Sequence, residues 1–199
     1  MKARKDDHRS RYTQMVVKDA LLKLLAEKQP NKITVSELCR SAGINRGTFY
    51  SHFYDVFDAY ECIENDFFAE VGAKLENIKS DDIDRPFFRE IMLLIYKHSD
   101  LVRLIISEKA SSDILKRIIG FVRAKFIAEW SESFKGHTVV FLNRVFTYIT
   151  NGSIGMISDW ITDGMREPLD DVSEAIAELN DLIINEYLSR DRGAGGRQA

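Results

Sequence analysis

The chain has 199 residues, of which 45% are hydrophobic and 30% are charged, so it can bury the core of one large domain or two small ones. Its 3 prolines, 11 glycines and 2 cysteines argue against collagen-like, low-complexity and loop-rich β proteins, and against a disulfide scaffold or a zinc cluster. No apolar run approaches the roughly 20 residues of a membrane helix, and the N-terminus lacks the apolar core of a signal peptide. We therefore expect a cytoplasmic protein with reduced cysteines.

The net charge of -3 is divided unevenly along the chain. Residues 1–54 carry 11 basic and 5 acidic side chains, a balance of +6, whereas residues 55–199 carry 17 basic and 26 acidic ones, a balance of -9. A basic segment of this kind is typical of a region that meets a polyanion. A solvated basic surface without a partner is the alternative, and charge alone does not separate the two.

The N-terminal quarter predicts three helices. Apolar residues three and four apart predict the first over about 9–28. Thr34 and Glu37 have the spacing of a capping box, which predicts a short second helix. Gly43 suits the left-handed position that closes it, and Asn45 is the cap of a third helix with the sequence RGTFYSHF. This part of the chain therefore predicts a helix, a tight turn and a helix.

From Asp55 onward the apolar spacing predicts helices and no strand. These helices are expected over residues 55–80, 86–98, 101–107, 111–134, 138–163 and 170–188. A polar break near residues 80–84 predicts a loop, and the Gly-rich residues 190–199 predict a disordered tail. The predicted fold is all-α, with about nine helices in total: a three-helix head, a long connecting helix and a C-terminal helical bundle.

The sequence of residues 33–55, ITVSELCRSAGINRGTFYSHFYD, resembles the helix-turn-helix of the TetR/AcrR family of bacterial transcriptional regulators. The resemblance implies a DNA-binding domain at 1–54 and a helical effector-binding and dimerisation domain at 55–189. The segment GSIGMISDWITDGM, which begins at Gly152, is similar to the penultimate helix of the subgroup of dihydroxyacetone-kinase operon activators.

The second helix of a helix-turn-helix enters the major groove with its N-terminal residues toward base edges. Arg46 is the candidate for a bidentate contact to guanine, with Thr48 beside it. Asn45 has the groups to read adenine, but its role as a cap competes. Glycine in a helix costs about 1 kcal/mol relative to alanine, so Gly47 indicates a close backbone approach, either to the first helix of the motif or to DNA.

Other residues of the motif are candidate phosphate contacts. The exposed side of the second helix offers Tyr50, Ser51 and His52, and the start of the first helix offers the hydroxyl of Thr34. Thr34 alone as a cap, and His52 as an ordinary surface histidine, are the alternatives.

One position departs from the family pattern. Members often carry a lysine directly after the cap of the fourth helix, where it contacts a phosphate, and this chain has Val56 there. The resemblance implies that the contact is lost or is replaced by basic residues of the N-terminal arm. These are Arg4, Lys5, Arg9 and Arg11.

The body offers candidates for an effector site and a dimer interface. Asn143, Thr147 and Asn151 lie four apart on one helix face, and if that face is buried they need a ligand, a dimer mate or a neighbouring helix as partners. Aromatic residues of the bundle are core by default, and by resemblance some of them, such as Phe121, line a cavity. The resemblance also implies that the last two long helices form the dimer. Its predicted apolar residues are Ile154, Ile157, Ile161, Ile176, Leu179 and Ile183.

The leading hypothesis is a cytoplasmic, nucleoid-associated regulator that binds double-stranded DNA. It would act as a homodimer on a palindromic operator, as a repressor, under the control of an effector in the C-terminal domain. The alternative keeps the DNA-binding head, but the body senses a protein partner instead of a small molecule. No catalytic motif, metal-ligand spacing or cofactor loop is found in the sequence, so we expect neither an enzyme nor a bound cofactor or metal.

Overall fold

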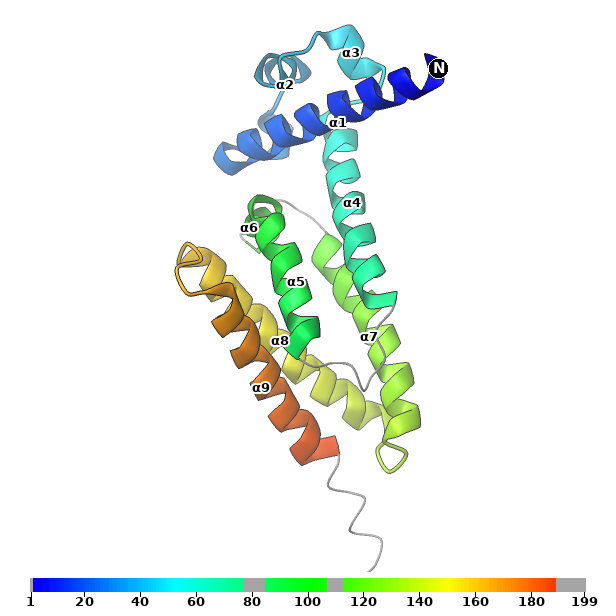
Figure 1. Ribbon diagram of the computed structural model, residues 1–199, viewed down its shortest axis with the longest axis vertical. Coiled ribbons are helices and arrows are strands. Elements are labelled where there is room, and N and C mark those ends of the chain that lie inside the picture. Colours follow the sequence, from blue (N-terminus) through cyan, green and yellow to red (C-terminus); the bar gives the residue numbers. More distant parts are fainter. Residues whose placement is uncertain (1, 77–84, 107–112, 189–199) are drawn as a thin grey trace, which may run out of the picture. The chain divides into compact units, whose positions relative to one another are not determined.

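The computed structural model describes residues 2–76, 85–106 and 113–188. These residues form nine α-helices and one 3-10 helix and contain no strand, which confirms the predicted all-α class (Figure 1). The helices are α1 (Lys2–Glu27), α2 (Val35–Ala42), α3 (Arg46–Tyr50), α4 (Val56–Glu76), α5 (Arg85–Lys97), α6 (Ser99–Ile106), α7 (Ile114–Ser133), α8 (Val139–Thr162) and α9 (Leu169–Leu188), with the 3-10 helix at Pro30–Lys32. The predicted loop at 80–84 and the predicted tail at 190–199 lie outside the described residues.

The chain forms two compact units. The first contains α1, α2, α3, α4 as far as Ala69, and α6 from Asp100; the second contains the end of α4 from Glu70 together with α5, α7, α8 and α9. The boundary between the two compact units falls within α4, between Ala69 and Glu70. The functional limits predicted from the sequence, 1–54, 55–189 and 190–199, stay a prediction.

Local sequence signals explain how the helices of the first unit begin and end. The Thr34 hydroxyl oxygen accepts a hydrogen bond from the Glu37 amide at 3.2 Å, and Gly43 closes α2 with a φ of 67°. The Glu37 carboxylate pairs with Lys28, and this hydrogen bond is the main cause that lowers the pKa of Glu37. The motif is held against α1 by buried side chains that include Leu38 and Phe49.

The first helix differs from its prediction. It begins at Lys2 rather than near residue 9. The prediction rested on apolar spacing, which starts only at Tyr12. The preceding residues contain lysine, arginine and alanine and no glycine or proline, so they can continue a helix without an apolar face. The basic N-terminal arm is therefore helical.

The second unit is built around aromatic side chains. The rings of Phe126, Trp130 and Phe146 contact one another with centroids 5.9–6.4 Å apart, and each is at least nine-tenths buried. Within this unit α7 packs on α8, α8 on α9, and α5 on α9 (Figure 1). For these three residues the expectation that the aromatics form the core is confirmed.

Helix α4 contributes to both units, and polar contacts hold it in each. In the first unit Lys18 Nζ of α1 lies 2.5 Å from Asp66 Oδ2. In the second unit Glu70 Oε2 accepts from Lys97 Nζ at 2.7 Å and lies 3.1 Å from His98 Nε2. Side chains of α4 are thus paired with Lys18 in the first unit and with Lys97 and His98 in the second unit.

Candidate nucleic-acid interface

Asn45 caps the predicted recognition helix α3. Its Oδ1 accepts a hydrogen bond from the Thr48 amide at 2.7 Å. To read adenine with both groups of its amide, Asn45 would need the same oxygen for the adenine amino group. Of the two roles considered from the sequence, the geometry therefore favours the cap.

A pair of substitutions separates these two roles of Asn45. We expect Asn45→Ala to lower the free energy of unfolding by about 1 kcal/mol, because the Thr48 amide loses its acceptor. Asn45→Ser keeps a capping oxygen but lacks the amide, so its stability should stay within a few tenths of a kcal/mol of the original. Chemical denaturation measures the first effect, and a binding assay on specific DNA measures the second. A stable Asn45→Ser variant that loses base preference would show that Asn45 reads DNA.

Gly47 lies exposed on α3. A Cβ atom added there would meet only the capping Oδ1 of Asn45, at 3.3 Å, and no atom of α2 within 4 Å. The structure therefore does not support a close approach to the first helix of the motif. The two remaining reasons for a glycine are the space needed by the cap and an approach to DNA.

The Arg46 side chain is exposed at the start of α3, and Nη2 donates a hydrogen bond to the Ser36 hydroxyl of α2. Sequence reasoning missed this contact, since no spacing rule links the two positions. Among the residues that the structure describes, Arg46 has no carboxylate partner. A guanidinium has five N–H donors, so the bond to Ser36 fixes its direction and leaves donors for a base edge.

The remaining motif residues differ in what they can offer a phosphate. Tyr50 is 58% exposed, and the Thr34 hydroxyl accepts from Glu37 and keeps its own proton. The Ser51 hydroxyl, in contrast, donates its single proton to the Thr48 carbonyl at 2.7 Å. Ser51 is therefore a weaker candidate donor than the sequence indicated.

The start of α4 explains the departure at Val56. This side chain is only 4% exposed and belongs to the core. Asp55 Oδ1 accepts from the Asp58 amide at 2.9 Å, and Asp58 Oδ2 accepts from the Tyr54 amide at 2.7 Å. Two carboxylates, those of Asp55 and Asp58, thus lie close in sequence to Val56 at the start of α4. Tyr54, which is 85% exposed beside them, was not singled out from the sequence.

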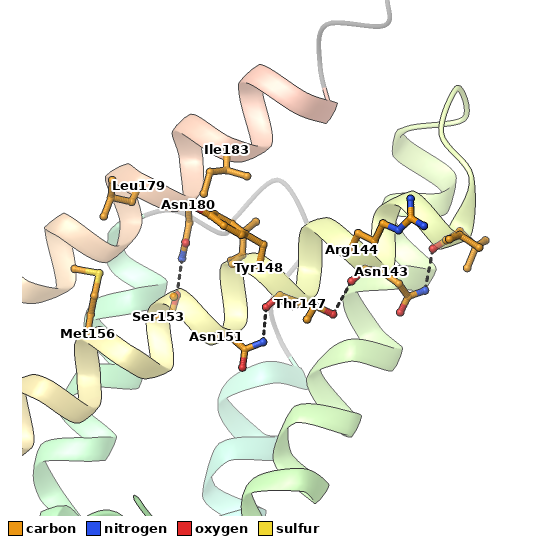
Figure 2. A pocket seen from close by; sticks show the side chains of 14 residues that line it. Asn143, Arg144, Thr147, Tyr148, Asn151, Ser153, Met156, Leu179, Asn180 and Ile183 are labelled. Carbon is orange, nitrogen blue, oxygen red and sulfur yellow. Dashed lines mark hydrogen bonds between the residues drawn. The ribbon is translucent and has the colours of Figure 1, made fainter.

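The predicted effector residues lie on the surface of α8. Figure 2 shows Asn143, Thr147 and Asn151 along a groove of about 910 Å³ between α8 and α9. Each side chain donates to the backbone carbonyl four residues earlier, at 2.8–2.9 Å. One donor of each side chain is thus used within the helix, and the three residues are exposed or half-buried rather than enclosed, so the condition under which they would need a ligand is not met. Phe121, the fourth predicted residue, is on α7 and does not line this groove.

A half-buried arginine that the sequence analysis missed lies beside the polar row of Asn143, Thr147 and Asn151. The Arg123 guanidinium of α7 is 5.2 Å from the centroid of the Phe146 ring. Its terminal nitrogens lie 3.4 Å from Asn143 Oδ1 and 3.5 Å from Thr147 Oγ1. The polar row therefore connects α7 with α8 inside one protomer.

The predicted dimer residues divide into two groups. Ile161 and Ile176 are each 1% exposed, so they form the protomer core and offer no surface to a partner; for these two the prediction is corrected. Ile154, Ile157 and Ile183 are half-buried and Leu179 is 49% exposed. The exposed apolar side chains of α8 and α9 that the prediction missed are Val139, Val140, Tyr148 and Leu182.

The floor of the groove is fixed by a polar pair. Asn180 of α9 is 4% exposed, and its Nδ2 donates to Ser153 Oγ of α8 at 3.1 Å (Figure 2). A Cβ atom added at Gly152 or Gly155 would meet nothing within 4 Å. The space beside these glycines is therefore open, and no described residue of this chain requires a glycine there by close packing.

None of the described helices is long and apolar enough to span a membrane. In the part of the chain that the structure describes, no three His, Cys, Asp or Glu side chains gather as metal ligands would.

Comparisons with known proteins show which families this chain matches. Residues 18–55 match the family model described as bacterial regulatory proteins, tetR family, and residues 85–181 match the model of a transcriptional regulator C-terminal region. No curated protein has a matching sequence. The predicted similarity to the dihydroxyacetone-kinase operon activators stays a prediction.

Three solved structures share the fold. A tetR-family transcriptional regulator from Streptomyces coelicolor has a TM-score of 0.67 at 13% identity, over 92% of this chain and 85% of that one. The fatty acid degradation regulator FadR from Bacillus halodurans has a TM-score of 0.61 at 13% identity, over 84% and 94%. A TetR transcriptional regulator from Streptococcus agalactiae 2603V has a TM-score of 0.59 at 16% identity, over 89% and 98%. With family models matched in both the head and the body, the chain belongs to the TetR family of DNA-binding transcriptional regulators.

Proposed function

We propose that the protein is a homodimeric repressor that binds a palindromic operator through α3, under the control of an effector that acts on the C-terminal unit. The exposed guanidinium of Arg46, bonded to Ser36 and without a carboxylate partner among the described residues, is the observation that carries the DNA-binding part. It lies in a segment with a charge balance of +6, which favours approach to a polyanion. The proposal assigns no catalytic role.

The dimer is proposed on the outer face of α8 and α9. Exposed apolar side chains there include Val140 and Tyr148 at 62% and 71% exposure, and Leu182 at 59%. Val140 and Tyr148 line the groove together with Leu179 and Ile183, and an apolar surface of this kind is expected to be covered by a partner. A second copy is the occupant we propose, because a two-fold dimer presents two recognition helices to the two halves of a palindrome.

Helix α4 is the proposed route from effector to DNA. Asp66, at the middle of α4, is paired with Lys18 of α1, and Glu70, four residues later, is paired with Lys97 of α5. An effector shifts operator affinity only if it binds the DNA-competent and incompetent states with different affinities. A change in the body that moves the end of α4 would be transmitted along the helix to the head.

A second candidate keeps the DNA-binding head but has a protein partner as its signal. Two observations favour it: the aromatic side chains Phe126, Trp130 and Phe146 are buried in contact with one another in the second unit, and the groove of α8 and α9 is lined by exposed residues such as Tyr148. A small-molecule pocket ordinarily encloses most of its ligand. An open apolar surface is closer to what a protein partner requires.

Selection of genomic DNA fragments with the purified full chain, repeated across a salt series, tests the DNA-binding proposal. We expect enrichment of a palindrome, with affinity that falls steeply as salt rises because phosphate contacts release counterions. A reporter gene behind the enriched site then distinguishes repression from activation. Retention of all fragments without preference at every salt concentration would contradict a sequence-specific regulator.

A further inference from the structure

A polar contact joins the N-terminal helix to the residue that follows the recognition helix by two positions. Ser10 Oγ of α1 lies 3.4 Å from Nδ1 of His52, which follows α3. The backbone amide of His52 donates to the Phe49 carbonyl at 2.9 Å, and the side chain is half-buried. Within the described part of the chain, Nε2 of His52 has no hydrogen-bond partner. The imidazole therefore has one nitrogen engaged by α1 and one free.

We propose that Ser10 is a positioning residue for His52: its hydroxyl donates to Nδ1, which keeps the hydrogen of the neutral ring on Nε2, where it donates to a DNA phosphate. A neutral imidazole carries one N–H and one acceptor nitrogen, and the partner of one nitrogen decides the role of the other. This inference rests on the proposed contact between His52 and DNA. It gives α1 a part in recognition that does not depend on its basic side chains.

The pairing makes the contact insensitive to the charge state of the ring. When the imidazole is protonated, Nδ1–H donates to Ser10 Oγ and the hydroxyl turns its own proton away. Nε2 carries a hydrogen in both states. Without the hydroxyl, the neutral ring can carry its hydrogen on Nδ1 and present a lone pair at Nε2 to the phosphate, which is repulsive. Only the protonated ring then donates dependably.

Other charged groups belong to the elements that meet at His52. On α1 these are Arg9 and Arg11, which flank Ser10 in sequence, and His8 two residues before it. On the other side Asp55 follows His52 by three residues and caps α4. His8 is a second imidazole near Ser10 in the sequence, so the test must isolate the effect that passes through His52.

The experiment measures operator affinity of the full chain at constant ionic strength, from about pH 5.5 to about pH 8.5, on the palindrome recovered by fragment selection. We expect Ser10→Ala to weaken binding about two- to ten-fold at the alkaline end, the range for a lost neutral hydrogen bond, and to match the original protein at the acidic end. Ser10→Thr, which keeps the hydroxyl, should restore the original profile. Thermal unfolding checks that each variant is folded.

A double-substitution cycle with His52→Gln supplies the control. Glutamine does not titrate, so Ser10→Ala should have no further effect in that background, whatever the state of His8. An equal loss at every pH, or a loss that persists beside His52→Gln, would show that Ser10 has only a structural role. If His52→Gln and His52→Ala bind as the original does, the DNA contact of His52 itself fails and the inference falls with it. If they weaken binding while Ser10→Ala is silent, only the role of Ser10 is overturned.

Discussion

Arg46→Ala is expected to abolish operator-specific binding while leaving the fold and the oligomeric state unchanged. A bidentate arginine contact to guanine discriminates by about 1–3 kcal/mol against a wrong base, and a dimer would lose one such contact in each half-site. The side chain is exposed, and among the residues that the structure describes its hydrogen-bond partner is the Ser36 hydroxyl, so its loss should change stability by no more than about 0.5 kcal/mol. Fluorescence anisotropy with specific and unrelated DNA at one salt concentration measures the effect.

Two further variants isolate the geometry of the contact from its charge. Arg46→Lys keeps the positive charge but lacks the planar fork, so it should retain affinity for unrelated DNA and lose preference for the operator. Arg166→Ala removes the same chemical group from an 80% exposed position in the second unit and should bind as the original does. Unchanged operator affinity in Arg46→Ala would end the assignment of α3 as the recognition helix.

The parts of the head that could be predicted are those governed by neighbours in sequence. The capping spacing of Thr34 and Glu37, the left-handed Gly43 and the cap at Asn45 each act within four residues, and all three appear in the structure. The hydrogen-bond partner of each hydroxyl or guanidinium group could not be predicted from the sequence. The Ser51 hydroxyl is consumed by a backbone carbonyl, and Arg46 is oriented by a residue ten positions earlier.

The body was less predictable because its helices are apolar on more than one face. On α8 the periodicity does not say which stripe faces inward, so Ile161, which is 1% exposed, was assigned to the dimer surface and the 71% exposed Tyr148 was not. The polar residues Asn143, Thr147 and Asn151 were hard to interpret from the sequence for a related reason. Each of these three side chains donates one hydrogen bond to a carbonyl of its own helix, and only the structure shows that.

Leu179→Glu is expected to convert the proposed dimer into monomers. Leu179 is 49% exposed on α9 and lines the groove between α8 and α9. In the monomer a glutamate there stays in water, so the protomer should remain folded, whereas in a dimer its carboxylate would be buried without a partner, which is strongly unfavourable. Sedimentation equilibrium should give 22.9 kDa for the variant and twice that mass for the original protein.

The same substitution connects the interface to DNA binding. A monomer reaches only one half-site at a time, so it loses the gain in effective concentration that links two sites, which is on the order of 10²–10⁴ in affinity. Leu93→Glu introduces the same change at a 37% exposed position on α5 and should leave both mass and operator affinity unaltered. If Leu179→Glu stays dimeric, the two copies meet elsewhere and the apolar face of α8 and α9 serves another partner, as the second candidate function requires. If the original protein is itself monomeric, a palindromic operator bound by a preformed dimer is contradicted.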